Sequence, residues 1–159
     1  EDTSFIQDYG CAWPEYSVDA RCSRLPATET HANLLRVEPG TPVLFRHLVE
    51  RVRGVPVQIR RSVMLWSVAG ETDLAREDKQ PWVGGTIAEL FSLGMETTSV
   101  PEEYVSRIIR PDEAAELMMP NGIVIWDNTR QFMVGDVVGE ASTVIHQAAG
   151  NSLSLVTHL

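Results

Sequence analysis

The sequence has no apolar run that approaches the ~20 residues needed to span a membrane, and no signal peptide at its start. We therefore expect a cytoplasmic protein without a membrane partner. Its 4 histidines and 2 cysteines show no metal-ligand spacing, so the sequence predicts neither a metal site nor another cofactor. Gly-x-Ser-x-Gly, Cys–His and Rossmann patterns are also missing, which leaves nucleophilic and dinucleotide chemistry without support.

Basic residues are scarce as well. The 13 Lys and Arg residues stand against 22 Asp and Glu residues, for a formal net charge of −9. Nucleic-acid phosphates need a basic surface, so we expect that this segment does not bind DNA by itself. Cys11 and Cys22 could form a disulfide, but two thiols in a chain that is not secreted are more often free.

What the chain does contain is typical of one soluble domain. It has 159 residues, of which 43% are hydrophobic and 22% charged, enough for a core of its own. It does not begin with Met, which suggests a piece of a longer protein. We expect a linker or poorly ordered lead-in over residues 1–14 and the folded domain over residues 15–159.

The clearest local pattern is a long β-hairpin over residues 42–66. Apolar and polar residues alternate along both halves, and the stretch from Arg53 to Pro56 supplies the reversal. One face combines apolar with polar and charged residues, which is typical either of a ligand-facing sheet or of a solvated outer face with ion pairs. The residues of this mixed face are Arg46, Leu48, Glu50, Gln58, Arg60, Ser62, Met64 and Trp66.

Further elements flank this hairpin on both sides. Before it, we expect a strand over residues 15–25 and a helix over residues 28–36 with Thr28 as its N-cap. After it, residues 69–85 are predicted to be a loop. A helix then begins at Thr86, and Glu89 follows at the spacing of a capping box. The expected apolar stripe of that helix is Ile87, Leu90, Phe91 and Leu93.

The second half of the chain repeats the order of the first. We expect a strand over residues 95–110 with an edge or bulge at Pro101, a short helix from Pro111, and a second hairpin over residues 123–147. Residues 153–159 could add a last strand. Because hairpins pair antiparallel, the repeated β-α-β-β order predicts an α+β fold: an antiparallel sheet with short helices packed on it.

Several short motifs follow one another along the chain. They include Val37-x-Pro39-Gly40-Thr41-Pro42-Val43, Gly54-x-Pro56-Val57-Gln58, Gly84-Gly85-Thr86-Ile87, Glu102-Glu103 and Pro111-x-Glu113-Ala114. This ordered set resembles the UTRA domain, the effector-binding half of HutC-type GntR transcription regulators. The resemblance implies a chorismate-lyase-like fold, a homodimer, and a ligand pocket between sheet and helices. It also implies an N-terminal winged helix-turn-helix through which the full protein binds operator DNA.

The resemblance locates a pocket but does not name its ligand. Sugar-phosphate-binding members of the family carry two Arg on the first hairpin strand and a Glu on the second. The matching positions here are Leu48, Glu50 and Arg60, so the charges are reversed. We therefore carry over only the place of the pocket, and expect weak binding of hexosamine phosphates.

Charged residues on the hairpin are the first candidates for ligand contacts. Arg46 and Arg60 could form a fork for a carboxylate or phosphate. Alternatively, Glu50 lies opposite Arg60 and forms a structural ion pair, which leaves Arg46 as the free cation. Glu50 could also bind an amino group of the ligand. The Gly84-Gly85-Thr86 turn offers backbone N–H groups for an anion, or is simply a loop that leads into a capped helix.

Three more charged residues lie in the second half: Glu103, Arg107 and Arg130. They are either ligand contacts or surface charges. The effector is expected to be a small anion or zwitterion. The complete candidate ligand-binding set is Arg46, Leu48, Glu50, Arg60, Ser62, Gly85, Thr86, Glu103, Arg107 and Arg130.

Three functions compete at this level. The first is a sensor of a small-molecule effector in a bacterial repressor. The second is an enzyme of chorismate-lyase-like fold that acts on a small aromatic acid, since a fold alone does not exclude catalysis. The third is a structural dimerisation domain. A homodimer is expected from the resemblance and from apolar stripes that exceed the needs of one small sheet face, namely Ile59, Val63, Leu65, Ile123 and Ile125.

Overall fold

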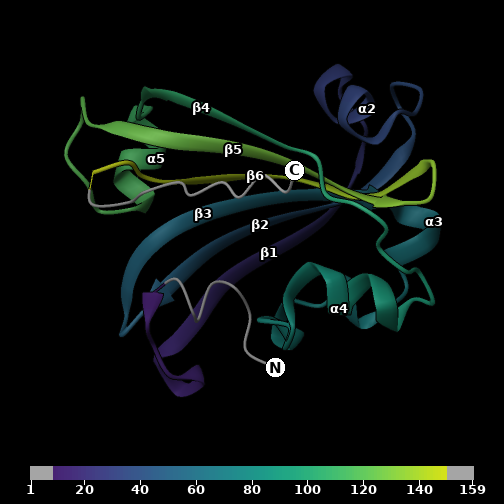
Figure 1. Cartoon of the computed structure of the whole chain (residues 1–159), viewed down its shortest axis with the longest axis horizontal. Coiled ribbons are helices and arrows are strands. Elements are labelled where there is room, and N and C mark those ends of the chain that lie inside the picture. Colours follow the sequence, from purple (N-terminus) through teal and green to yellow (C-terminus); the bar gives the residue numbers. More distant parts are fainter. Residues whose placement is uncertain (1–8, 150–159) are drawn as a thin grey trace, which may run out of the picture.

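The computed structural model describes residues 9–149, which form a six-stranded antiparallel sheet of order β1-β2-β3-β6-β5-β4. The strands fan apart towards one end of the sheet (Figure 1). The predicted α+β fold is confirmed. The strands are β1 (Tyr16–Pro26), β2 (Pro42–Val52), β3 (Val55–Leu65), β4 (Glu102–Ile108), β5 (Val124–Val134) and β6 (Val137–Gln147).

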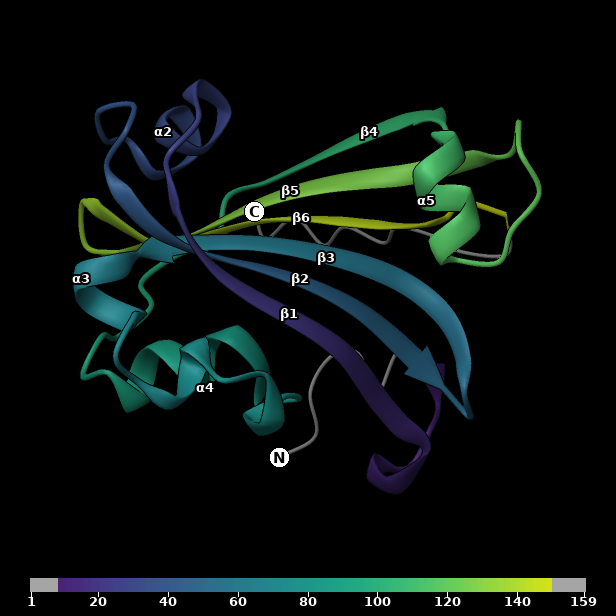
Figure 2. The same ribbon diagram turned by 180° about the vertical axis from the view of Figure 1, so that it is seen from behind.

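The helices are short and lie between the strands. The repeated β-α-β-β order is present: each half contributes three strands, and the halves meet where β3 pairs with β6. Helices α3, η2, η3 and α4 lie between the two halves in sequence, and Figure 2 shows α3 and α4. The helices are η1 (Trp13–Glu15), α2 (Glu29–Leu35), α3 (Trp66–Ala69), η2 (Asp73–Ala75), η3 (Glu77–Lys79), α4 (Gly85–Ser92) and α5 (Pro111–Glu116).

Helices α2 and α5 cover one side of the sheet, called the α2/α5 face below. Thr28 accepts a hydrogen bond from the backbone N–H of His31, as the predicted N-cap requires. Ile59, Val63 and Ile125, which were expected to form a dimer surface, are buried in this core of the monomer. These side chains pack between the sheet and helices α2 and α5 of the same chain. They therefore give no reason to expect a dimer.

The opposite side, called the α4 face below, is covered by α3 and α4. Leu44, Met64, Leu90 and Phe132 form its apolar core. A Cβ added to Gly139 would come within 3.0 Å of Leu90, so the helix approaches β6 closely where the strand has no side chain. Arg46, Glu50, Arg60 and Ser62 lie buried on this face and Gln58 is half-buried, so the solvated-outer-face interpretation is wrong.

Several local predictions need correction. Residues 69–85 hold two short helical turns, η2 and η3, rather than a plain loop. Only residues 102–108 of the predicted long strand pair continuously, after a single bridge at Ser99, and they form a sheet edge as expected. Ile87 and Phe91 are exposed, so the apolar stripe of α4 is narrower than predicted. The predicted strand over residues 153–159 and most of the predicted lead-in lie outside the described residues.

Candidate ligand-binding site

A row of polar side chains crosses the α4 face from β2 to β4. Residues that are directly opposite in paired strands project to the same side of a sheet. The register therefore places one polar residue of each strand side by side. This row, called the polar row below, consists of Arg46, Ser62, Ser142, Arg130 and Glu102.

Arg46 is fully buried at one end of the polar row, with 0% of its surface exposed. Its Nη1 and Nη2 donate to the two carboxylate oxygens of Glu89 at 2.9 and 2.7 Å. Nη2 also contacts Glu140 at 2.6 Å, and Nε donates to Ser62 at 2.9 Å. Because its charge is fully paired inside the protein, Arg46 is not the free cation that we expected.

The start of α4 is built differently from the predicted capping box. Gly84 is the N-cap, in the left-handed conformation, and no side chain caps the helix. The Thr86 hydroxyl instead accepts from Arg60 at 3.0 Å and lies 3.3 Å from Glu140. Glu89 points into the sheet towards Arg46. Both supposed capping residues therefore anchor α4 to the sheet.

The glycine turn before α4 offers fewer free donors than predicted. The backbone N–H of Gly85 donates to the carbonyl of Trp82 at 3.1 Å. This donor is therefore not free to bind an anion. Gly85 and Thr86 stay candidate ligand residues only through their position beside the polar row.

Glu50 and Arg60 form the ion pair that the sequence allowed, but not in the expected register. Arg60 lies opposite Leu48, which is fully buried, and Glu50 lies opposite Gln58. The ion pair is diagonal, with 3.2 Å between Arg60 Nε and Glu50 Oε1. Gln58 Nε2 donates to the other oxygen of Glu50. Arg60 and Glu50 thus neutralise each other next to the Arg46 cluster.

The two buried carboxyls around Arg46 have different proton affinities. Burial raises the pKa of Glu140 to about 7, although Arg46 opposes this rise. Burial also disfavours ionisation of Glu89, but its two-point contact with Arg46 outweighs burial and lowers the pKa. Arg46 is therefore balanced chiefly by Glu89, whereas burial favours the neutral form of Glu140.

Unsatisfied polar atoms gather at the other end of the polar row. Within residues 9–149, no hydrogen-bond partner is found for Nε of Arg130, Oγ of Ser142 or Oδ1 of Asn128. Ser142 is 1% exposed and Asn128 is 4% exposed. Buried polar atoms in native proteins are nearly always satisfied, so this group is where a ligand is expected.

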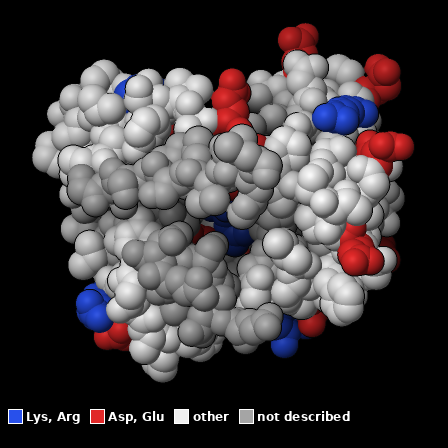
Figure 3. Space-filling view, in the orientation of Figure 1, with Lys and Arg blue, Asp and Glu red and all other residues white. Residues whose placement is uncertain are grey.

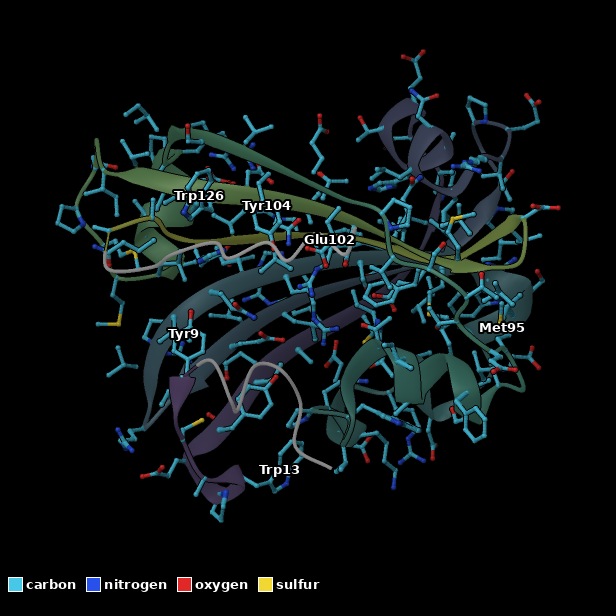
Figure 4. The ribbon with its side chains drawn as sticks, viewed as in Figure 1. Tyr9, Trp13, Met95, Glu102, Tyr104 and Trp126 are labelled. Atoms are coloured by element: carbon cyan, nitrogen blue, oxygen red, sulfur yellow. The ribbon has the colours of Figure 1, made fainter. Side chains whose placement is uncertain are left out.

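An aromatic pair adjoins these atoms. The rings of Tyr104 and Trp126 meet edge to face, with centroids 6.3 Å apart. Glu102 Oε2 accepts from the Tyr104 hydroxyl at 2.8 Å and from Asn128 at 3.3 Å. Figure 4 shows Glu102, Tyr104 and Trp126 following one another along this side of the sheet. Figure 3 shows a hollow in the centre of the same view, with basic and acidic side chains at its floor.

Glu103 and Arg107 lie on the opposite side of the sheet. Register pairs them with Thr129 and Ile125 on the α2/α5 face, away from Arg130. Arg107 binds both oxygens of Glu113, at 2.8 and 2.9 Å. The structure therefore does not bring this pair together with the other candidate ligand residues.

Metal sites, disulfides and membrane-spanning helices have no support in the part of the chain that the structure describes. No group of three or more His, Cys, Asp or Glu residues between 9 and 149 is arranged to hold a metal ion. Cys11 and Cys22 are both free, as predicted. None of the described helices is long and apolar enough to cross a membrane.

Sequence comparison gives a clear family result. The sequence model of the UTRA domain matches residues 20–144. A comparison with curated proteins found no match. The resemblance noted from the motifs is thus confirmed by a match across most of the chain.

Solved structures agree in fold. PhnF from Mycobacterium smegmatis has a TM-score of 0.77 and 21% identity over 99% of this chain and 68% of its own. The C-terminal domain of the histidine utilization repressor from Pseudomonas syringae pv. tomato str. DC3000 has a TM-score of 0.76 and 19% identity, over 91% of this chain and 99% of its own.

A third structure, described as a GntR-family transcriptional regulator, has a TM-score of 0.79 and 21% identity over 92% of this chain. The chain spans only 60% of that protein's length. These neighbours confirm the predicted fold. The match over residues 20–144 shows that the chain belongs to the UTRA domain family.

Proposed function

We propose that this chain senses a small-molecule effector for a transcriptional repressor, and that the effector binds on the α4 face beside Arg130. The observation that carries the proposal is the group of buried atoms without partners on Arg130, Ser142 and Asn128. An unsatisfied buried polar atom costs about 1–3 kcal/mol, which a ligand that supplies the missing bond recovers. We also propose that operator DNA is bound by a separate N-terminal winged-helix domain, as the family resemblance implies. The charge of −9 argues against DNA binding by this segment itself.

The charge of the site favours an effector with an anionic group. Arg46, Arg60 and Arg107 are held by carboxylates of the protein. None of the ion pairs among residues 9–149 includes Arg130. Arg130 therefore takes the role first given to Arg46, and the Ser142 hydroxyl lies beside it as a donor.

The polar row also offers a route from the effector to α4. Ser142 lies opposite Ser62, and Ser62 accepts a hydrogen bond from Arg46, which holds α4 through Glu89. An effector at Ser142 thus touches the same row that anchors the helix. It changes the protein's conformation to the extent that it prefers one position of α4 over another.

Replacing Arg130 with glutamine should abolish most effector binding. A charge-assisted hydrogen bond contributes ~1.5–3 kcal/mol, so affinity should fall roughly 10- to 150-fold. The variant should fold as stably as the wild type, because Arg130 forms no ion pair with any described carboxylate. The measurement is a thermal-shift screen of carboxylic acids and phosphate esters, followed by calorimetric titration of each hit against both proteins.

The matched control is Arg21→Gln, an exposed arginine on β1 that projects to the other face. Its affinity should equal that of the wild type. Equal binding by wild type and Arg130→Gln would refute the proposed position of the site. We also infer that the domain is not an enzyme, so chromatography should recover every bound compound unchanged; turnover would support the enzyme instead.

We further propose that the domain forms a homodimer by pairing of β4 with β4 of a second copy. Strand β4 is an edge of the sheet and carries exposed Val105 at its centre. Unpaired edge strands are natural templates for another chain. The other edge, β1, is partly covered, because Glu77 accepts the backbone N–H of Cys22 at 2.9 Å.

The sequence of β4 suits antiparallel pairing with itself. Gln131 donates to the carbonyl of Pro101, so alternate residues of β4, from Glu102 on, present their backbone groups outwards. An axis at Val105 satisfies this pattern and sets Glu103 of each copy opposite Arg107 of the other. Opposite charges in such cross-strand pairs are favourable.

Glu103→Lys should shift the domain from dimer towards monomer, since it sets lysine opposite arginine twice. Light scattering at high micromolar concentration should detect a dimer for the wild type and a smaller mass for the variant. Ser17→Lys, on the exposed side of β1, is the control and should remain dimeric. A wild-type monomer, or a Glu103→Lys dimer as stable as the wild type, contradicts this interface.

A further inference from the structure

Two opposite charges and an aromatic pair lie next to one another at the proposed effector site. We infer that the effector is a zwitterion of the α-amino-acid type whose side chain carries a planar ring. The inference rests on the proposed function, because it names the class of molecule that would occupy the position beside Arg130. It adds a second charged group and an apolar part to the anionic group proposed above.

The charged groups are Arg130 on β5 and Glu102 on β4, which are direct register partners. The neighbouring pair, Pro101 and Gln131, is hydrogen-bonded through its backbone, so Glu102 and Arg130 form the other kind of pair, in which side chains approach most closely. Yet none of the ion pairs of residues 9–149 joins them. Each is therefore available to an opposite charge on a ligand.

The carboxylate of Glu102, an exposed residue, is hydrogen-bonded by two neutral neighbours. The Tyr104 hydroxyl and the Asn128 amide both donate to Oε2 of Glu102. These bonds fix the carboxylate and leave Oε1 as an acceptor for an ammonium group. With Nε of Arg130 unsatisfied nearby, the site has one acceptor and one donor for the two charged groups on a single carbon atom.

The aromatic pair continues from these charges along the same two strands. Tyr104 and Asn128 form the next same-face pair after Glu102 and Arg130, and Trp126 lies in the pair beyond. Successive same-face pairs are about 7 Å apart, at roughly 3.4 Å per residue. A ring attached to the amino-acid head group can therefore lie against Tyr104 and Trp126, where aromatic contacts are favourable.

The arrangement discriminates against simpler ligands. A phosphate or dicarboxylate drawn to Arg130 would also face the carboxylate of Glu102, which repels it. An amine without a carboxylate would leave the arginine unpaired beside its own positive charge. An aliphatic amino acid satisfies both charges but not the aromatic surface.

The test uses four probes that differ by one feature each: L-phenylalanine, 3-phenylpropionate, 2-phenylethylamine and L-norleucine. Calorimetric titration of the 159-residue chain should show the tightest binding for phenylalanine. The analogues that lack the amino or the carboxylate group should bind at least about tenfold more weakly, as expected for loss of one charged contact. Norleucine should also bind more weakly than phenylalanine.

Glu102→Gln should reduce the affinity for phenylalanine about tenfold and leave that for 3-phenylpropionate unchanged or improved. Glu38→Gln, an exposed glutamate in the turn after α2, is the control and should change neither affinity. If 3-phenylpropionate matches phenylalanine in the wild type and depends on Arg130, the zwitterion is refuted while the effector site stands. Failure of all four probes to bind below roughly 1 mM refutes the aromatic amino-acid class.

Discussion

Arg46→Met should lower the free energy of unfolding by about 3–5 kcal/mol, the usual cost of removing one partner from a buried ion pair. Arg46 is fully buried, and its loss leaves Glu89 and Glu140 facing each other without a cation. At roughly 2–4 °C per kcal/mol for a domain of this size, the midpoint of thermal unfolding should fall by roughly 6–20 °C. Urea denaturation and thermal melting both measure the effect.

The control for this change is Arg76→Met. Arg76 also pairs with two carboxylates, Asp73 and Asp78, but its side chain is 54% exposed. Such surface pairs contribute little, so the control should unfold close to the wild type. Adding Glu89→Leu to Arg46→Met should recover part of the lost stability, because it removes an uncompensated charge. An Arg46→Met protein as stable as the control contradicts this account.

The architecture was largely predictable because its signals are local. Turn residues and alternation located both hairpins, and Thr28 marked the start of α2 correctly. The repeated β-α-β-β order then left few ways to build an antiparallel sheet. The predicted apolar stripe of α4 was partly wrong, because Ile87 and Phe91 match the helical period but are exposed. Periodicity alone does not show which apolar residues are covered by a neighbouring element.

The site was harder to predict because its contacts are long-range. Thr86 and Glu89 satisfy the capping-box spacing, yet Glu89 binds Arg46, 43 positions away in sequence. Glu140, which completes the cluster, is 94 positions from Arg46 and was not a candidate. A local pattern describes what a side chain can reach within one turn, but not a stronger partner brought close by the fold.

The choice among arginines failed for the same reason. Arg46, Arg60 and Arg130 have the same charge and lie on the same face, so sequence offers no way to rank them. Arg60 pairs with Glu50 of the same hairpin, as one alternative from the sequence allowed, but the carboxylates that neutralise Arg46 come from α4 and β6. Arg130 stands out only when the partners of every described ionic group are known.

A second buried ionic cluster holds α5 against the sheet. Glu113, 0% exposed, accepts hydrogen bonds from Arg107 and from the backbone N–H of Arg110, and lies 3.2 Å from Arg61. Burial alone would raise the pKa of Glu113, but these bonds outweigh it and lower the pKa to about 2. The acid in the first turn of this helix thus fixes the helix to β4 and β3.

Glu113→Gln should therefore cost about 3 kcal/mol at neutral pH, the free energy of lowering a carboxyl pKa from 4.5 to about 2. A lowered folded-state pKa contributes stability above the unfolded value, and this contribution is lost as pH falls from about 4.5 to about 2. The stabilities of wild type and variant should consequently converge over that range, as urea denaturation at stepped pH would show. Asp112→Asn, next to it in sequence but with a side chain 64% exposed, should follow the wild-type profile throughout. Parallel curves for wild type and Glu113→Gln from neutral to acidic pH would mean that the carboxylate of Glu113 does not hold the helix.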